Sequence, residues 1–286
     1  MSYGRKVIVE FITPQGLKRL KDIDVKFDVN LAMGAVNTWA RISILNLNRE
    51  DIALLTGFGG QWVERRKRKR IRLFAGYDDT ELALIFDGDI INAIPTQPPN
   101  VWLHCEAISG AYGSTQMFSR SILVPSNINS VINQAAGWMG LTLDWQSDSK
   151  KIIEKFDFTG GKTLLMESIA KLGNIIPFEE DGKLVVVDRD APRRDGPIRD
   201  EEIRIISEQT GMVMVPKIDY VGMEATIFLD TRIRRGDSVK LESKTIPSAN
   251  GPYYVRNLRH HGHLRGISFY TEIKAWRRNT YEPNPT

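Results

Sequence analysis

Cysteine is almost absent from this chain of 286 residues, in which Cys105 is the single one. A lone cysteine cannot form an intramolecular disulfide, and Cys105 sits in the alternating run Val-Trp-Leu-His-Cys-Glu-Ala, which favours a buried packing role. We therefore expect a protein that is made in a reducing cytoplasm.

Long hydrophobic runs and a large excess of one charge are missing as well. No apolar run approaches the roughly 20 residues of a membrane-spanning helix, and the first ten residues carry charge where a signal peptide needs an apolar core. We expect neither membrane insertion nor classical secretion. With 39 Lys and Arg against 35 Asp and Glu, the formal net charge is only +4, so any nucleic-acid site must be local.

The motifs of common catalytic centres do not occur. The sequence contains no Gly-x-Ser-x-Gly and no His-Glu-x-x-His. The run Phe158-Thr-Gly-Gly-Lys-Thr163 resembles the end of a phosphate-binding loop, but such a loop needs a glycine where Phe156 stands. We interpret this run as a glycine turn before a helix.

Two other polar groups have ordinary structural interpretations. Asp87-Gly88-Asp89 places two carboxylates at an expected strand end, which is typical of a charged turn. His260, His261 and His263 have no carboxylate or cysteine at local ligand spacing, and a strand would point His260 away from the other two. We predict a solvated turn there, and we predict no catalytic residue, cofactor or metal site in the chain.

What the sequence does contain, from residue 5 to residue 108, is period-two alternation of apolar residues. It predicts about six short strands, centred on Val7 to Phe11, Ile23 to Val29, Ile42 to Ile44, Ile71 to Leu73, Leu82 to Phe86 and Val101 to Cys105. One helix interrupts them, with Asn48 as N-cap and the glycines from Gly57 to Gly60 at its end. Six strands with a lone helix predict a small antiparallel β-barrel over residues 1–108.

Residues 109–200 follow a different pattern, in which two helical segments each precede an extended run. Asn127 caps the first helix, and a strand follows from Leu141. The second helix runs from Thr163 to Leu172 and precedes a hairpin that turns at Asp181-Gly182. We predict an α+β insertion.

Beyond a linker rich in Pro, Gly and charge, strands return over residues 201–286 without helices. They are expected at 212–219, 222–229, 238–243, 253–259 and 267–276. Arg235-Gly236-Asp237 marks one turn, and Asn250-Gly251 marks a hairpin, either as a tight turn or within a longer loop that includes Pro247. In the first region, Gly76 and Gly88 are assigned to turns.

The two β regions can be laid over one another by their last three strands. The overlay sets Ile71 on Val239, Ala83-Leu-Ile-Phe on Tyr253-Tyr-Val-Arg, and Leu103 on Tyr270. Residue identity is negligible, and strand order and spacing match. The fold class we predict is therefore mainly β, with two small antiparallel β-barrels flanking an α+β region.

The sharpest local feature is a basic run, Arg65, Arg66, Lys67, Arg68, Lys69 and Arg70. Such a run can neutralise phosphates, protect a strand edge by its charge, or meet an acidic partner protein. We predict an exposed loop or strand edge that meets another protein chain, because six consecutive cations would repel one another if they were buried.

Several strings resemble the tube domains of phage baseplate hub proteins. In the C-terminal region these are residues 215–217, 222–229, 235–243, 250–258 and 261–275, among them Asn250-Gly-Pro-Tyr-Tyr-Val-Arg-Asn-Leu258. In the N-terminal region they are residues 40–47, 73–77 and 85–90. The resemblance covers nearly the whole chain, in the order barrel, insertion, barrel.

The resemblance implies a structural protein of the virion tail baseplate, assembled in the host cytoplasm. Three chains with two barrels each would form a ring that meets a hexameric tail tube on one side and a trimeric central spike on the other, with further baseplate proteins around it, and DNA would pass through. Three subunits with two domains each reconcile threefold with sixfold symmetry. Two alternatives stay open: a DNA-binding accessory protein that uses residues 65–70, and a tail-associated hydrolase with its site in the insertion.

Overall fold

The computed structural model describes residues 4–13, 15–56, 69–78, 82–111, 116–197 and 202–277. Its three α-helices are α1 (Arg49–Thr56), α2 (Ile128–Trp138) and α3 (Lys162–Ala170). The strands of the N-terminal region are β1 (Arg5–Thr13), β2 (Gly16–Leu20), β3 (Val25–Ala32), β4 (Trp39–Leu45), β5 (Arg70–Tyr77), β6 (Ala83–Pro95) and β7 (Trp102–Ile108). Those of the middle region are β8 (Met117–Ile122), β9 (Ser126–Asn127), β10 (Thr142–Gln146), β11 (Ile152–Ile153), β12 (Phe156–Gly161), β13 (Ile175–Glu180) and β14 (Lys183–Asp188). Those of the C-terminal region are β15 (Arg204–Ser207), β16 (Lys217–Ile218), β17 (Gly222–Phe228), β18 (Ser238–Glu242), β19 (Gly251–His263) and β20 (Phe269–Arg277).

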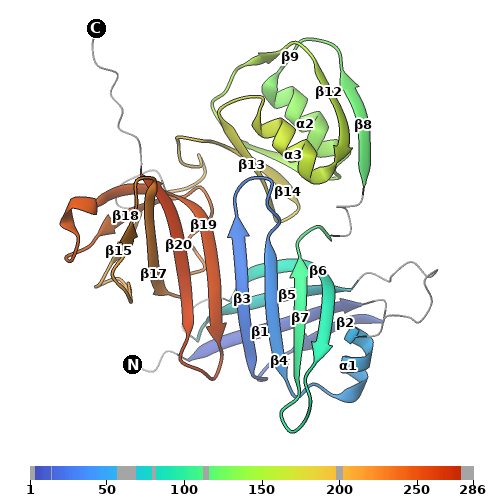
Figure 1. The fold of residues 1–286 in the computed structure, drawn as a ribbon, viewed down its shortest axis with the longest axis vertical. Coiled ribbons are helices and arrows are strands. Elements are labelled where there is room, and N and C mark those ends of the chain that lie inside the picture. The colour runs from blue at the N-terminus through green and yellow to red at the C-terminus, as the bar shows by residue number, and fades with distance from the viewer. Residues whose placement is uncertain are drawn as a thin grey trace.

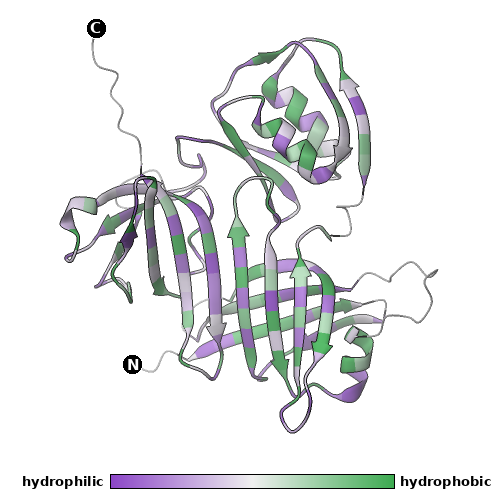
Figure 2. Cartoon of the chain, viewed as in Figure 1, coloured by the Kyte–Doolittle hydropathy of each residue, from purple (hydrophilic) through white to green (hydrophobic). Residues whose placement is uncertain are grey.

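Apolar and polar side chains alternate along the strands. Figure 2 shows this alternation as changes between green and purple along β3, β19 and β20. In β7, Leu103 and Cys105 are fully buried, whereas His104 between them is exposed. Burial raises the pKa of the Cys105 thiol to about 12, which leaves the thiol unreactive at neutral pH. The packing role expected of the single cysteine is confirmed.

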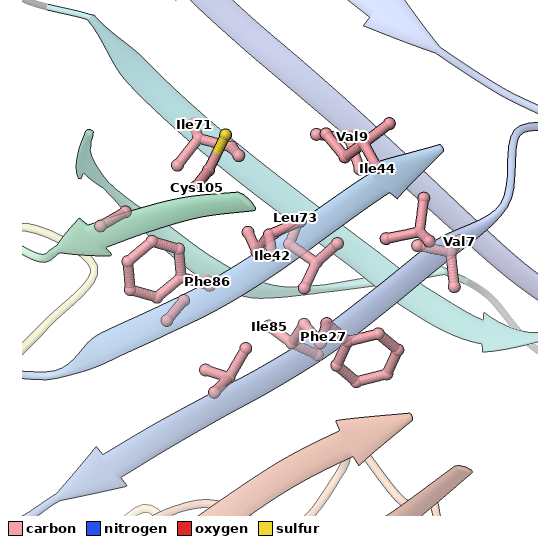
Figure 3. Packing of buried hydrophobic residues seen from close by; sticks show 14 of the residues in the cluster. Val7, Val9, Phe27, Ile42, Ile44, Ile71, Leu73, Ile85, Phe86 and Cys105 are labelled. Atoms are coloured by element: carbon pink, nitrogen blue, oxygen red, sulfur yellow. The ribbon is translucent and has the colours of Figure 1, made fainter. Parts of the chain in front are cut away.

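The core of the N-terminal region lies between strands that cross one another. β1 and β5 run across β3 and β4 (Figure 1), and side chains from both sets fill the space between them (Figure 3). Helix α1 closes one edge through Leu55, and the Asn48 side chain caps it by accepting the N–H of Asp51 at 2.8 Å. The predicted helix start is confirmed, and the glycines expected at its end lie outside the described residues.

One continuous sheet joins the N-terminal and C-terminal regions. Its main path runs β16-β17-β20-β19-β3-β4-β7-β6-β5-β1-β2, and β18 and β15 branch from β19. The long strand β19 pairs with β18 through residues 251–254 and with β3 through residues 257–263. The mainly β class is confirmed, but within the described residues no closed barrel is detected. The outer edge of β3 pairs with β19 and is therefore not available to close a barrel within the N-terminal region.

The two β regions share a strand order. Neighbouring strands run β4-β7-β6-β5 in the first region and β17-β20-β19-β18 in the second, all antiparallel. The long strands β6 and β19 have 13 residues each, and each contains a bulge where it pairs with the next strand, at Ile91 and at Arg256. The strand order and the match of Ile71 with Val239 agree with the overlay made from the sequence. The residue alignment of the other two strands is wrong, because Ile90 rather than Ile85 corresponds to Val255, and Leu103 corresponds to Thr271 rather than Tyr270.

The α+β insertion has a hydrophobic core of its own. Its buried side chains come from α2, α3, β8, β12 and the sheet β10-β14-β13. Figure 1 shows α2 and α3 side by side, framed by β8, β9 and β12. The Asn127 side chain caps α2 by accepting the N–H of Asn129 at 3.0 Å. Among the described helices none is long and apolar enough to cross a membrane.

Two of the glycines assigned to turns lie inside strands instead. Gly76 pairs with Lys6 in the ladder between β1 and β5. Gly88 lies within β6, and a Cβ there would come within 2.9 Å of the Ile108 backbone. Close approach of neighbouring strands, rather than a turn, explains the glycine at 88.

The loop between β18 and β19 is longer than a two-residue turn. It spans residues 243–250 and contains a 3₁₀ turn at Pro247–Ala249. The Asn250 side chain closes it by accepting the Ser243 N–H at 2.7 Å and donating to the Ser243 carbonyl at 3.2 Å. Gly251, with φ of +143°, starts β19. The hairpin is therefore present in its longer form, and the tight-turn form is wrong.

The turn predicted at Arg235-Gly236-Asp237 is also present. Gly236 has φ of +85°, and the Asp237 N–H donates to the Arg234 carbonyl at 3.2 Å.

Candidate functional site

The basic run is only partly visible, because Arg65, Arg66, Lys67 and Arg68 lie outside the described residues. Lys69 donates from Nζ to the Leu55 carbonyl at 3.2 Å, and burial lowers its pKa. Arg70 begins β5 and binds both carboxylate oxygens of Asp87, with Nη2 to Oδ2 at 2.7 Å. Arg72 reaches the same carboxylate from Nε at 3.1 Å. The C-terminal end of the run is thus bound to its own sheet.

Asp87 and Asp89 lie within β6, so the charged turn predicted for them is wrong. Asp87 neutralises two arginines of the neighbouring strand, and Asp89 is buried. A strand of 13 residues continues through Gly88, because Phe86, Ile90 and Ala93 pack against the core on either side of it.

The three clustered histidines lie in β19, and the solvated turn predicted for them is also wrong. His260 is 2% exposed and contacts Thr271 Oγ1 at 2.9 Å through Nδ1. Burial lowers the pKa of His260 to about 4, so the ring is neutral at neutral pH. His263 contacts Asp24 at 2.9 Å, and His261 lies 3.0 Å from Glu272. Each ring faces a different partner, and the described residues contain no group of side chains that could hold a metal ion.

The run that resembles a phosphate-binding loop ends β12 and starts α3 at Lys162. The Lys162 ammonium is paired with the Glu179 carboxylate, and both side chains are largely buried. A lysine that is already neutralised by a carboxylate has little to offer a phosphate. The structural interpretation of this run agrees with the geometry.

Two buried arginines join the insertion to the sheet, and no pattern in the sequence predicted the burial of either. Arg235, which is 4% exposed, donates to the Ala32 carbonyl at 2.8 Å and to the Glu179 carbonyl at 2.9 Å. It also lies over the Phe178 ring, 4.6 Å from the centroid. Arg193, 2% exposed, donates to Glu180 at 2.6 Å and to Asp195 at 2.8 Å. Hydrogen bonds from Arg235 therefore connect the C-terminal region with β3 and with β13.

Several strand edges of the sheet have no second strand neighbour within the described residues, including those of β2 and β15. Part of β6 and the strand β16 are two further examples. β6 pairs with β5 only up to Asp89, so residues 91–95 have no strand partner on that side. Helix α1 packs against β6 (Figure 1), and Ile91 and Ile94 remain exposed. In β19 the corresponding half is occupied by β3. At one end of the sheet, β16 pairs with β17 alone, and the segment around it exposes Met214, Val215, Ile218 and Tyr220. Unpaired edges with exposed apolar side chains are candidate sites for pairing with another chain.

Comparison with known proteins agrees with an assembly role. A family model described as baseplate hub gp41 matches residues 7–275. No curated protein sequence matches the chain.

Solved structures of two tail proteins and of a secretion-system component share the fold. A tail protein from Neisseria meningitidis MC58 has a TM-score of 0.66 at 10% identity, with 96% of this chain and 97% of that chain covered. A 43 kDa tail protein of prophage MuSo2 from Shewanella oneidensis has a TM-score of 0.65 at 7% identity, with 94% and 96% covered. The E. coli c3393 protein, a component of the type VI secretion system, has a TM-score of 0.58 at 9% identity, with 89% and 73% covered. At these identities the likeness shows the fold.

Proposed function

Because the chain belongs to the baseplate hub gp41 family, we propose that three copies of it form the ring at the centre of a phage tail baseplate. In this proposal the chain is a structural, non-catalytic part of the virion. Its ring joins a hexameric tail tube to a trimeric central spike, contacts other baseplate proteins, and lets DNA pass during ejection.

The observation that carries the proposal is the repeated strand order joined by the contact between β3 and β19. That contact sets the edge of one β region against the long strand of the other within a single chain. The equivalent surfaces have no strand partner within the described residues: the second half of β6, inside the path of the sheet, and the edge formed by β16 at its end. If a neighbouring copy repeats the internal contact, the association is head-to-tail, and it closes after three copies into six similar units.

The shared register predicts which residues meet across that contact. Ile90 corresponds to Val255 and Ala107 to Ala275, because these residues pair in the equivalent ladders. By the same correspondence, Pro95 in β6 is equivalent to His260 in β19. In the second region, Ile218 in β16 is equivalent to Val29 in β3. Within the chain, His260 pairs with Val29. Ile218 of one copy should therefore lie opposite Pro95 of the next.

Disulfide trapping tests this contact. Directly opposed residues in antiparallel strands lie within the distance that a disulfide bridges. We expect the variant Pro95→Cys with Ile218→Cys to form covalent trimers under mild oxidation, while the unmodified chain has the mass of a trimer in solution. The matched control, Leu17→Cys with Ile218→Cys, places the first thiol on β2 at the opposite end of the sheet and should stay uncrosslinked. A strictly monomeric chain with no crosslink at either pair would overturn the ring.

The basic run belongs to the outer or intersubunit side of this ring. A strong cationic girdle in the channel would hold DNA during ejection, whereas an outer position lets the run meet acidic surfaces of other proteins. Arg70 and Arg72 already bind Asp87, which leaves residues 65–68 as the part of the run that can act on a partner.

A further inference from the structure

A small pocket of about 190 Å³ opens where the end of β14, the turn before β17, the middle of β19 and the end of β20 meet. Three arginines line it, Arg189, Arg256 and Arg277, together with a single carboxylate, that of Asp190. Tyr220, which is 100% exposed, and Trp276, which is 37% exposed, form an aromatic rim. The lining is therefore cationic and aromatic.

The bulge in β19 explains how Arg256 enters this pocket. The register between β19 and β20 shifts between Val255 and Asn257, so Arg256 has no residue opposite it. A bulge redirects a side chain from its regular face. Arg256 is 5% exposed and lies over the Trp276 ring, 4.5 Å from the centroid.

The Arg256 guanidinium is poorly neutralised for a buried group. It donates to the Arg189 carbonyl, whereas its Nε–H has no hydrogen-bond partner in the described part of the chain. The Asp190 carboxylate already accepts from the Asn174 side chain at 2.7 Å. Burial lowers the pKa of Arg256 to about 10 even though Asp190 acts in the opposite direction. Arg193, by contrast, meets the carboxylates of Glu180 and Asp195.

We propose that this pocket binds a carboxylate side chain from an acidic segment of a partner protein. A carboxylate is planar and can accept two bonds from one edge of a guanidinium. The Trp276 ring under Arg256 holds the guanidinium in place at the pocket. The aromatic rim offers apolar contact to the residue next to the acidic one, as at the centre of protein interfaces.

The size and shape of the pocket favour a protein side chain over other anions. Sites for cofactors and drug-sized ligands usually measure about 300–1,000 Å³, so this pocket is too small for a nucleotide. Phosphates along a nucleic acid are read by exposed cations on a groove or face, whereas Arg256 is almost fully buried. A single Asp or Glu side chain fits both the volume and the charge.

The test uses the full-length chain and blocked peptides as probes. One peptide, acetyl-Ser-Gly-Glu-Phe-Gly-Ser-amide, carries the carboxylate, a second has Gln in place of Glu, and a third has phosphoserine. A short oligothymidylate serves as the nucleic-acid probe. The readout is the nitrogen-15 NMR signal of the Arg256 Nε–H, assigned by its loss in Arg256→Lys, and the affinity follows from the titration.

We expect the Glu peptide to shift this signal and the Gln peptide to leave it unchanged. Arg256→Lys retains the charge but loses the planar guanidinium that can donate two hydrogen bonds to a carboxylate. The affinity of this variant is followed by the other signals that shift, and it should fall about tenfold. Arg277→Gln changes an exposed rim residue that cannot affect folding much, and it should weaken binding about threefold. Arg265→Gln, an exposed arginine away from the pocket, is the matched control and should leave the affinity unchanged.

Three results would overturn the proposal. One is the absence of any shift with the Glu peptide, and another is an equal shift with Glu and Gln. The third is tighter binding of phosphoserine or oligothymidylate, which would assign the pocket to phosphate. None of these outcomes depends on whether the chain forms a trimer, so the two proposals fail separately.

Discussion

At the scale of single residues, three buried polar side chains have specific partners. His260, Arg193 and Arg235 are all under 5% exposed. Each meets a partner far away along the chain or in the neighbouring strand, such as Thr271 for His260. Such groups are costly to bury unless they are hydrogen-bonded, and they tie stability to their protonation state.

His260 predicts a loss of stability in mild acid. Its pKa in the folded chain is about 4, because burial disfavours the imidazolium, against an ordinary value of 6.5. As the pH falls below 6.5, His260 becomes protonated in the unfolded chain but stays neutral in the folded chain until about pH 4. The neutral ring therefore contributes to the free energy of unfolding fully above pH 6.5, and this contribution, at most roughly 3 kcal/mol, is lost between pH 6.5 and 4.

Urea unfolding across this pH range checks the expectation. His260→Gln should remove this part of the pH dependence, whereas His104→Gln, at an exposed position in β7, should leave it in place. A pH dependence that is identical in all three proteins would contradict a neutral, buried His260.

At the scale of elements, alternation was a good guide to the strands that have one face on the core. The strands predicted from Val7 to Cys105 correspond to β1, β3, β4, β5, β6 and β7. The strands β2, β8, β9, β11, β12 and β15 were not predicted. β2 has no buried residue and therefore no alternation, and β15 has only four residues, which pair in parallel with β18.

The alternation in β7 gives a matched pair of variants. Leu103→Asp puts an unpaired charge at a fully buried position and should lower the free energy of unfolding by roughly 3 kcal/mol or more. His104→Asp introduces the same side chain one residue later, on the exposed face, and should change it by less than about 0.5 kcal/mol. Denaturant unfolding of both variants is the measurement, and similar losses would contradict the assigned faces. Ile227→Asp in β17 should resemble Leu103→Asp, because Ile227 is 3% exposed.

At the scale of the whole molecule, the continuous sheet and the arginines at its junction make three regions one body. β19 holds the two β regions together by backbone pairing, and Arg235 ties the insertion to both. This arrangement leaves strand edges without a second strand neighbour in the described part of the sheet.

The basic run gives a prediction at this scale. Replacing Arg65, Arg66, Lys67 and Arg68 by Ser should leave thermal unfolding of the chain unchanged, because repelling cations contribute little to the fold. It should weaken assembly with acidic partner proteins, measured as the yield of complete baseplates. Arg70→Ser is the contrasting variant, since it breaks the ion pair with Asp87 and should lower stability modestly. Unimpaired assembly of the fourfold variant would remove the partner role, and an assembled ring with residues 65–68 in the channel would overturn their outer placement.

The sequence by itself determined the local structure and the family. Period-two alternation, the caps Asn48 and Asn127, and the order of the last three strands in each region are local or regular signals, and they led to the correct elements. The tertiary structure alone decided that β3 pairs with β19, that His260 is buried, and that Arg235 and Arg256 are buried. The physical reason is that every strand edge presents the same backbone N–H and C=O groups, so the sequence of a strand does not specify which strand it pairs with. Whether a charged side chain is buried likewise depends on groups that can be distant in the sequence. The carbonyl of Ala32, which accepts from Arg235, lies about two hundred residues away along the chain.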